Sequence, residues 1–167
     1  YFIEWKRISY LPSYAFFTDF LKAKKQAKTD LLAFGDADVS LPNAAIEVDS
    51  ISRIFPKAEI LKSDKASKEK LIALCGNYKL LHFATHCKLN IDPRWSYIVL
   101  APPGSGNLTV REILGLSGYL KMSSLATLSA CETAVELEPE KAGMELTTLS
   151  NAFKVAGVQS IIASLWE

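Results

Sequence analysis

The sequence lacks any apolar run of the roughly 20 residues that a helix needs to cross a bilayer. Its first residues also lack the basic, apolar and small-residue order of a signal peptide. Neither sign of charge is in clear excess, because the 167 residues include 19 Lys and Arg and 18 Asp and Glu. No overall field therefore draws the protein to nucleic acid or to an anionic membrane. We expect a soluble, cytoplasmic protein with no direct nucleic-acid or membrane partner.

Cysteine and histidine are scarce. The chain has three cysteines: Cys75, Cys87 and Cys131. An odd number without the spacing of a disulfide framework favours free thiols over a secreted fold held by disulfide bonds. The two histidines, His82 and His86, are four residues apart, which on a helix would suggest a metal pair. Their segment has the pattern of a strand and lacks convergent acidic ligands. The glycines at 104 and 106 do not open a helix after a strand, as a phosphate-binding loop does. We expect neither a metal nor a cofactor.

The length suits a single domain with its own core. The chain begins without Met and stops directly after an apolar, strand-like run. We therefore expect residues 1–167 to form one domain, cut from a longer protein. The Pro- and Gly-rich stretch at 101–107 and the acidic stretch at 135–143 are predicted to be loops and not domain boundaries.

Short apolar runs alternate with helical patterns along the chain. The run Leu31–Gly35, closed by Gly-Asp-Ala-Asp, is typical of a buried strand in a parallel sheet. From Pro42, apolar residues recur at helical spacing until Pro56. A helix capped by Ser67 and a helix ended by Gly157 follow. Further strands are predicted at 58–61, 79–85, 96–100, 125–129 and 159–165, with an edge strand at 2–9 and a helix at 13–28. This alternation predicts an α/β fold, a three-layer sandwich with a mostly parallel central sheet.

Two predicted strands end at residues that could form a catalytic pair. The strand at 79–85 leads to His86, and the strand at 125–129 leads to Cys131. In parallel sheets the ligand site lies beyond the carboxyl ends of the strands. A cysteine nucleophile needs a neighbouring base, because the thiolate is the reactive form. The plainer alternative is a buried, inert thiol and a loop histidine. Ser-Ala-Cys131 follows His86 by 45 positions, in the order of the caspase signature, where the separation is about 50.

The end of the first strand is expected to border the same cleft. Asp36 and Asp38 follow Gly35 there, and Ser129 precedes the candidate nucleophile. No arginine lies at that strand end to receive an acidic side chain, so carboxylates would favour Lys or Arg in a substrate. The alternative is that both aspartates only finish a turn. Arg94, in the loop after His86, could reverse the preference.

Several longer motifs occur in one order along the chain. They are Leu81-His-Phe-Ala-Thr-His86, Leu128-Ser-Ala-Cys-Glu-Thr133, Gly143-Met-Glu-Leu, Asn151-Ala-Phe-Lys-Val-Ala-Gly157 and Ala163-Ser-Leu-Trp166. Together with Ile8 to Ser13, Leu41 to Val48 and Leu108 to Ile113, they resemble the CHAT domain. This caspase-like module is often found beside TPR repeats. The resemblance covers essentially the whole chain.

The resemblance implies a clan CD cysteine peptidase fold with His86 and Cys131 as the catalytic residues. It also implies an oxyanion hole made by backbone N–H groups at Cys131 and at the residue after the histidine. That residue is usually Gly in the family, whereas this chain has Cys87, whose side chain restricts the backbone. The oxyanion geometry is where this sequence departs from the family pattern.

We therefore predict a cysteine endopeptidase that acts on proteins or peptides through a thioester intermediate. The resemblance suggests flanking TPR-like repeats or a regulatory partner, and a role in bacterial signalling or defence. A catalytically silent CHAT-like interaction module is the main alternative, and an ordinary flavodoxin-like binding domain is a third. Four glutamates after the nucleophile, at 132, 136, 138 and 140, predict an activation loop that orders when a partner docks, or a plain solvated loop.

Overall fold

The computed structural model describes residues 31–88, 90, 92–102, 104–129 and 149–164. The strand predicted at 2–9, the helix at 13–28 and the acidic loop at 135–143 lie outside these residues. Among the helices that the structure describes, none has the length and apolar character to cross a membrane.

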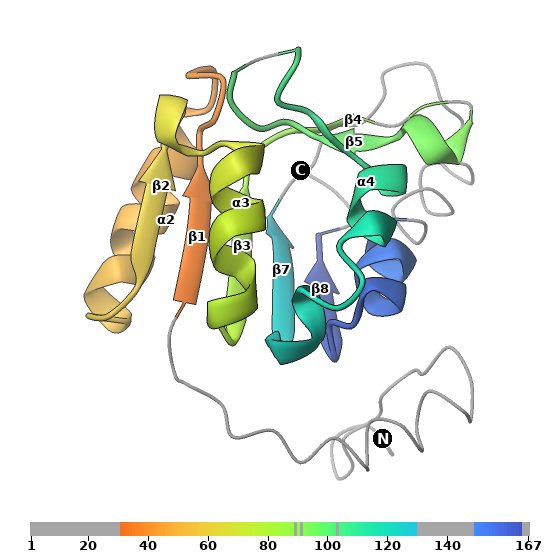
Figure 1. The fold of residues 1–167 in the computed structure, drawn as a ribbon. Coiled ribbons are helices and arrows are strands. Elements are labelled where there is room, and N and C mark those ends of the chain that lie inside the picture. The colour runs from red at the N-terminus through yellow and green to blue at the C-terminus, as the bar shows by residue number, and fades with distance from the viewer. Residues whose placement is uncertain (1–30, 89, 91, 103, 130–148, 165–167) are drawn as a thin grey trace, which may run out of the picture.

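Within the described part of the chain, five parallel strands form the central sheet, in the order β2-β1-β3-β7-β8 (Figure 1). They are β1 (Leu31–Gly35), β2 (Glu59–Lys62), β3 (Leu80–Ala84), β7 (Leu125–Ser129) and β8 (Ser160–Ala163). The strand order reverses between β1 and β3, because β2 lies on one side of β1 and all later strands lie on the other. In open α/β sheets such a switch point is where ligands bind, at the carboxyl ends of the strands.

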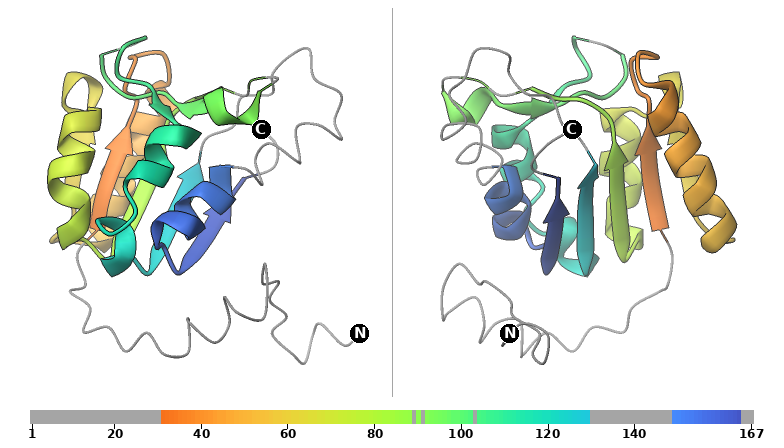
Figure 2. Two further views of the ribbon diagram at one scale, coloured as in Figure 1. Left: turned by 45° about the vertical axis from the view of Figure 1, so that its right-hand side comes forward. Right: turned by 180° about the vertical axis from the view of Figure 1, so that it is seen from behind.

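Helices cover both faces of this sheet (Figure 2). Helix α2 (Pro42–Ile54) packs on one face, and α3 (Lys68–Leu74), α4 (Val110–Gly115) and the helical residues 149–156 pack on the other. Successive side chains along a strand point to opposite faces of the sheet, so the described core consists of two clusters, one on each face. In β1, Phe34 belongs to the larger cluster, whereas Ala33 packs toward α2. The predicted α/β sandwich with a parallel central sheet is confirmed.

The larger core cluster is centred on aromatic rings from separate elements. Phe34 of β1 and Phe83 of β3 stack with their ring centroids 5.2 Å apart, and Phe83 contacts Phe153 at 5.6 Å. All three side chains are fully buried. Burial of such large apolar surfaces is the main force that holds a helix layer on a sheet.

The helix ends follow the local signals in the sequence. Pro42 occupies the first turn of α2, and the helix ends just before Phe55 and Pro56. The Ser67 hydroxyl accepts a hydrogen bond from the backbone N–H of Lys70 and caps α3, as predicted. Helix α4 starts with a capping box between Thr109 and Glu112. Short 3-10 segments connect the described elements: η2 (Ser63–Lys65), η3 (Cys75–Asn77), η4 (Pro93–Trp95) and η5 (Leu120–Met122).

The strand predicted at 96–100 is shorter than expected and lies outside the central sheet. It becomes β5 (Tyr97–Ile98), the middle strand of a small antiparallel sheet with β4 (Cys87–Lys88) and β6 (Leu108–Thr109). The apolar residues after β5 bond to loops instead: Val99 N–H donates to the His86 carbonyl at 2.9 Å. An apolar run of this length shows that a segment is buried, but it does not show which strand is its neighbour.

Candidate active site

The loop after β1 folds back over the switch point. The Asp36 N–H donates to the Ala84 carbonyl at the end of β3, at 3.0 Å. The Asp36 carboxylate is buried and accepts a 2.7 Å hydrogen bond from the N–H of Leu41. Asp36 and Val39 have positive φ values of 47° and 60°. These contacts turn the chain so that the next residues face β3.

Ser40 and Asp38 reach His86, which follows β3. The Ser40 hydroxyl lies 2.8 Å from His86 Nε2. The same hydroxyl donates to Asp38 Oδ1 at 2.7 Å. Asp38 Oδ2 is 4.0 Å from His86 Nε2. The structure thus brings together Asp38 and His86, two of the predicted site residues, and adds Ser40, which the sequence pattern did not single out.

The backbone around His86 is held by Val99, the residue that follows β5. The His86 carbonyl accepts the Val99 N–H, and the Thr85 hydroxyl donates to the Val99 carbonyl at 2.8 Å. The His86 side chain is only 20% exposed. Its second ring nitrogen, Nδ1, is buried and has no hydrogen-bond partner among the described residues. Nε2 is therefore held by a hydrogen bond, whereas Nδ1 could still donate or accept one.

Strand register relates the histidine to the position of the candidate nucleophile. Ala84, the last residue of β3, is the register partner of Ser129, the last residue of β7. His86 and Cys131 each come two positions later in the sequence. Cys131 itself lies outside the described residues.

Ser129 is linked to a residue that was missed in the sequence. Its hydroxyl donates to Glu47 Oε2 of α2 at 3.0 Å, and Glu47 Oε1 lies 2.9 Å from His82 Nε2 of β3. Burial lowers the pKa of His82, and the Glu47 carboxylate offsets this only in part. Burial therefore favours the neutral form of His82 in the folded protein. The sequence signals for Glu47 were its place beside Val48 in a predicted helix and its position in the stretch from Leu41 to Val48 that carries the family resemblance.

The two described cysteines have the character of core residues. Cys75 and Cys87 are both buried. Burial raises the pKa of Cys75 to about 11, which keeps it a thiol. The Cys87 side chain packs into the larger core cluster, and its backbone does not take the left-handed conformation for which Gly is favoured. Arg94 is exposed and ion-paired with Asp92 at 2.7 Å.

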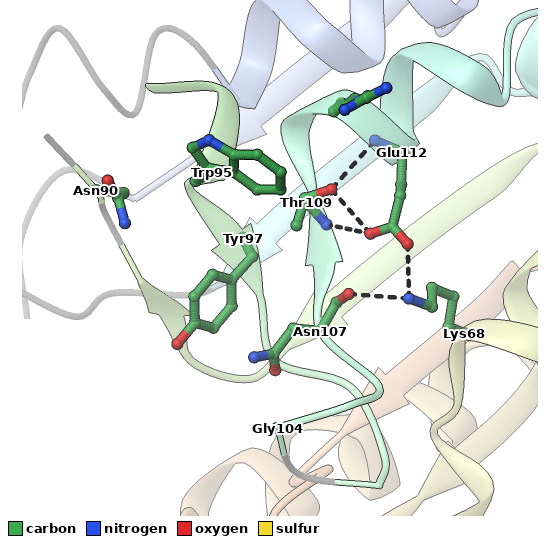
Figure 3. Close-up of a pocket in the computed structure, with 9 residues that line it drawn as sticks. Lys68, Asn90, Trp95, Tyr97, Gly104, Asn107, Thr109 and Glu112 are labelled. Carbon is green, nitrogen blue, oxygen red and sulfur yellow. Dashed lines mark hydrogen bonds and ion pairs between the residues drawn. The ribbon is translucent and has the colours of Figure 1, made fainter. Parts of the chain in front are cut away.

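A separate cavity of about 560 Å³ lies on the outer side of the small sheet (Figure 3). The rings of Trp95 and Tyr97 line one side, and the ion pair between Lys68 and Glu112, 2.7 Å long, lies on the other. Of the predicted site residues that the structure describes, none lines it. Across the described ranges, no three His, Cys, Asp or Glu side chains gather in a group that could hold a metal ion.

Comparison with known proteins agrees with this architecture. A family model described as the CHAT domain matches residues 1–167, the whole chain. A comparison with curated proteins gives no match.

Proposed function

The chain belongs to the CHAT domain family, a caspase-like family related to peptidases, and from this premise we propose that it is a cysteine endopeptidase. His86 is the base and Cys131 the nucleophile. One observation carries the proposal: β3 and β7 are neighbours in register, with Ala84 opposite Ser129, and the two reactive residues follow at the same offset. Neighbouring parallel strands place their following residues at one edge of the sheet.

The proposed reaction has two steps. His86 takes the proton of the Cys131 thiol, and the thiolate attacks the peptide carbonyl carbon. The C–N bond breaks, the amine leaves with the proton from His86, and a thioester remains. Water, deprotonated by His86, then attacks the thioester; the C–S bond breaks, the Cys131 sulfur takes the proton back from His86, and the carboxylic acid is released. Backbone N–H groups at Cys131 and Cys87 stabilise the oxyanion, a role carried over from the family.

The substrate pocket is the second part of the proposal. Asp36, Asp38 and Ser129 border the carboxyl ends of β1 and β7, and carboxylates at that edge favour Lys or Arg before the cleaved bond. Arg94 could reverse this preference only by binding an acidic substrate side chain. In the described conformation its guanidinium is bound to Asp92 instead. We further propose protein or peptide substrates, and flanking TPR-like repeats or a regulatory partner that controls access.

An electrophilic peptide probe tests the proposal directly. Cys131 should be labelled, and Cys131→Ala should abolish both labelling and cleavage of a peptide library. His86→Ala should lower the rate about 10²–10⁴-fold, the usual contribution of a positioned base. Cys75→Ala is the matched control and should leave both readouts unchanged. Full peptidase activity in Cys131→Ala would refute the assignment. A folded protein with neither labelling nor cleavage would support the catalytically silent interaction module instead.

A further inference from the structure

The two nitrogens of the His86 ring have different surroundings. Nε2 lies 2.8 Å from the Ser40 hydroxyl, whereas Nδ1 is buried without a partner among the described residues. Which nitrogen carries the proton decides which one can act as a base, because a neutral imidazole has one N–H and one lone pair.

The Ser40 hydroxyl settles this question by its hydrogen-bond polarity. A hydroxyl has a single hydrogen to donate. Ser40 points it at Asp38 Oδ1, 2.7 Å away, and a carboxylate can only accept. Toward His86 the same oxygen must therefore accept, so Nε2 is the protonated nitrogen. The lone pair of the neutral ring is left on Nδ1.

We propose that Asp38 and Ser40 form a positioning chain that holds His86 in the Nε2–H tautomer, with Nδ1 as the base for Cys131. This inference rests on the proposed peptidase function. When Nδ1 takes the thiol proton, the ring becomes a cation, and Asp38 Oδ2 lies 4.0 Å from its Nε2. An opposite charge at that distance stabilises the imidazolium. Asp38 then acts through His86, whatever it contributes to substrate binding.

The backbone of the loop that carries Asp38 and Ser40 is held in place by hydrogen bonds on both sides. Val39, next to Ser40, adopts φ 60°, a conformation that is a genuine outlier for a β-branched residue. Such a conformation persists only where surrounding contacts impose it. Here the contacts are the bonds from Asp36 N–H to Ala84 and from Leu41 N–H to Asp36, which anchor the loop on both sides of Val39.

Nuclear magnetic resonance of ¹⁵N-histidine tests the tautomer without any need for activity. The chain has only two histidines, so His82→Gln assigns both ring signals. Long-range ¹H–¹⁵N correlations should show His86 protonated at Nε2. Ser40→Ala should release it to a tautomer mixture, and Ser40→Thr, which keeps the hydroxyl, should restore it. Asp49→Asn, an exposed position in α2 paired with Lys62, is the control and should change nothing. A wild-type Nδ1–H tautomer, or no change in Ser40→Ala, would overturn the proposal.

Kinetics of the same variants separates positioning from substrate recognition. Ser40→Ala and Asp38→Asn should each lower kcat by about tenfold or more, a part of the ~10²–10⁴ that a positioned base supplies, with KM little changed. For Ser40→Ala the loss should be equal for peptides with Arg or Leu before the cleaved bond, and Ser40→Thr should recover most of it. For Asp38→Asn the loss should include the Leu peptides, which a pocket for basic residues would not affect. A loss confined to basic peptides would overturn the positioning role. An inactive wild-type protein would refute the peptidase function, while the tautomer measurement would still decide the proposal.

Discussion

Ser129 Oγ donates a 3.0 Å hydrogen bond to Glu47 Oε2, which ties the last residue of β7 to helix α2. The other oxygen of the same carboxylate lies 2.9 Å from His82 of β3. One side chain from α2 therefore connects the two strands whose ends lead to His86 and Cys131. His82 is buried, and a buried polar group that loses a partner is costly, so Glu47 stabilises the side chains at this edge of the sheet.

The neutral state of His82 makes stability depend on pH. Burial lowers the pKa of His82 in the folded state, whereas in the unfolded chain it returns to its ordinary value of about 6.5. Below that pH the unfolded state binds more protons than the folded state, so the free energy of unfolding falls as the pH falls. Well above about pH 6.5, His82 is neutral in both the folded and the unfolded state, and it no longer makes the free energy of unfolding depend on pH. His82→Gln should flatten the decline between about pH 7 and pH 5, as measured by urea unfolding. An unchanged slope would contradict the prediction.

Gly35, the last residue of β1, is required for the close approach of α2. A Cβ at this position would come within 2.7 Å of Val48 Cγ2 and 3.2 Å of the Ala44 carbonyl. Val48 is fully buried and cannot move into solvent. Gly35→Ala should therefore cost about 1–3 kcal/mol of stability, the usual effect of overpacking, and should lower the proposed peptidase activity by displacing the loop that carries Ser40.

Gly115→Ala is the matched control for this measurement. Gly115 is the last residue of α4, and a Cβ there would meet nothing within 4 Å. Alanine is also the better helix former, so thermal and denaturant unfolding should show an unchanged or slightly raised stability. Equal destabilisation by the two substitutions would show that packing against α2 is not the cause.

The three cysteines should differ in reactivity. Burial raises the pKa of Cys75 to about 11, and Cys87 is buried in the core. If Cys131 is the nucleophile, iodoacetamide at neutral pH should modify it well before the other two, because only the thiolate reacts. Mass spectrometry of timed samples measures the order. In a denaturant all three should react at similar rates, and early modification of Cys75 in the folded protein would contradict the prediction.

Substrate preference can be tested apart from the positioning of His86. Asp36→Asn keeps an oxygen that can accept from the Leu41 N–H but removes the negative charge. The ratio of kcat/KM for peptides with Arg to peptides with Leu before the cleaved bond should therefore fall, and Ser129→Ala should shift the same ratio. An unchanged ratio in both variants, or efficient cleavage after Asp in the wild-type protein, would rule out a pocket for basic residues.

Local patterns in the sequence were sufficient to predict the elements on which the site is built. Strands β1 and β7 begin and end where their apolar runs do, and Ser67 caps α3 because an N-cap needs only residues a few positions away. Strand ends are visible in such patterns, so His86 and Cys131 could be chosen as candidates before any contact was known.

Only the tertiary structure decided which side chains lie beside the candidate residues. Ser40 meets His86 across 46 positions, and Ser129 meets Glu47 across 82. Both pairs form because β3 lies between β1 and β7 in the sheet: the loop after β1 meets the residue after β3, and Glu47 of α2 reaches side chains of both β3 and β7. The same holds for Val99, which continues an apolar run but bonds to the His86 carbonyl instead of a strand of the central sheet. Apolar periodicity reports that a side chain is buried, whereas its partner depends on strand order, which involves the whole chain.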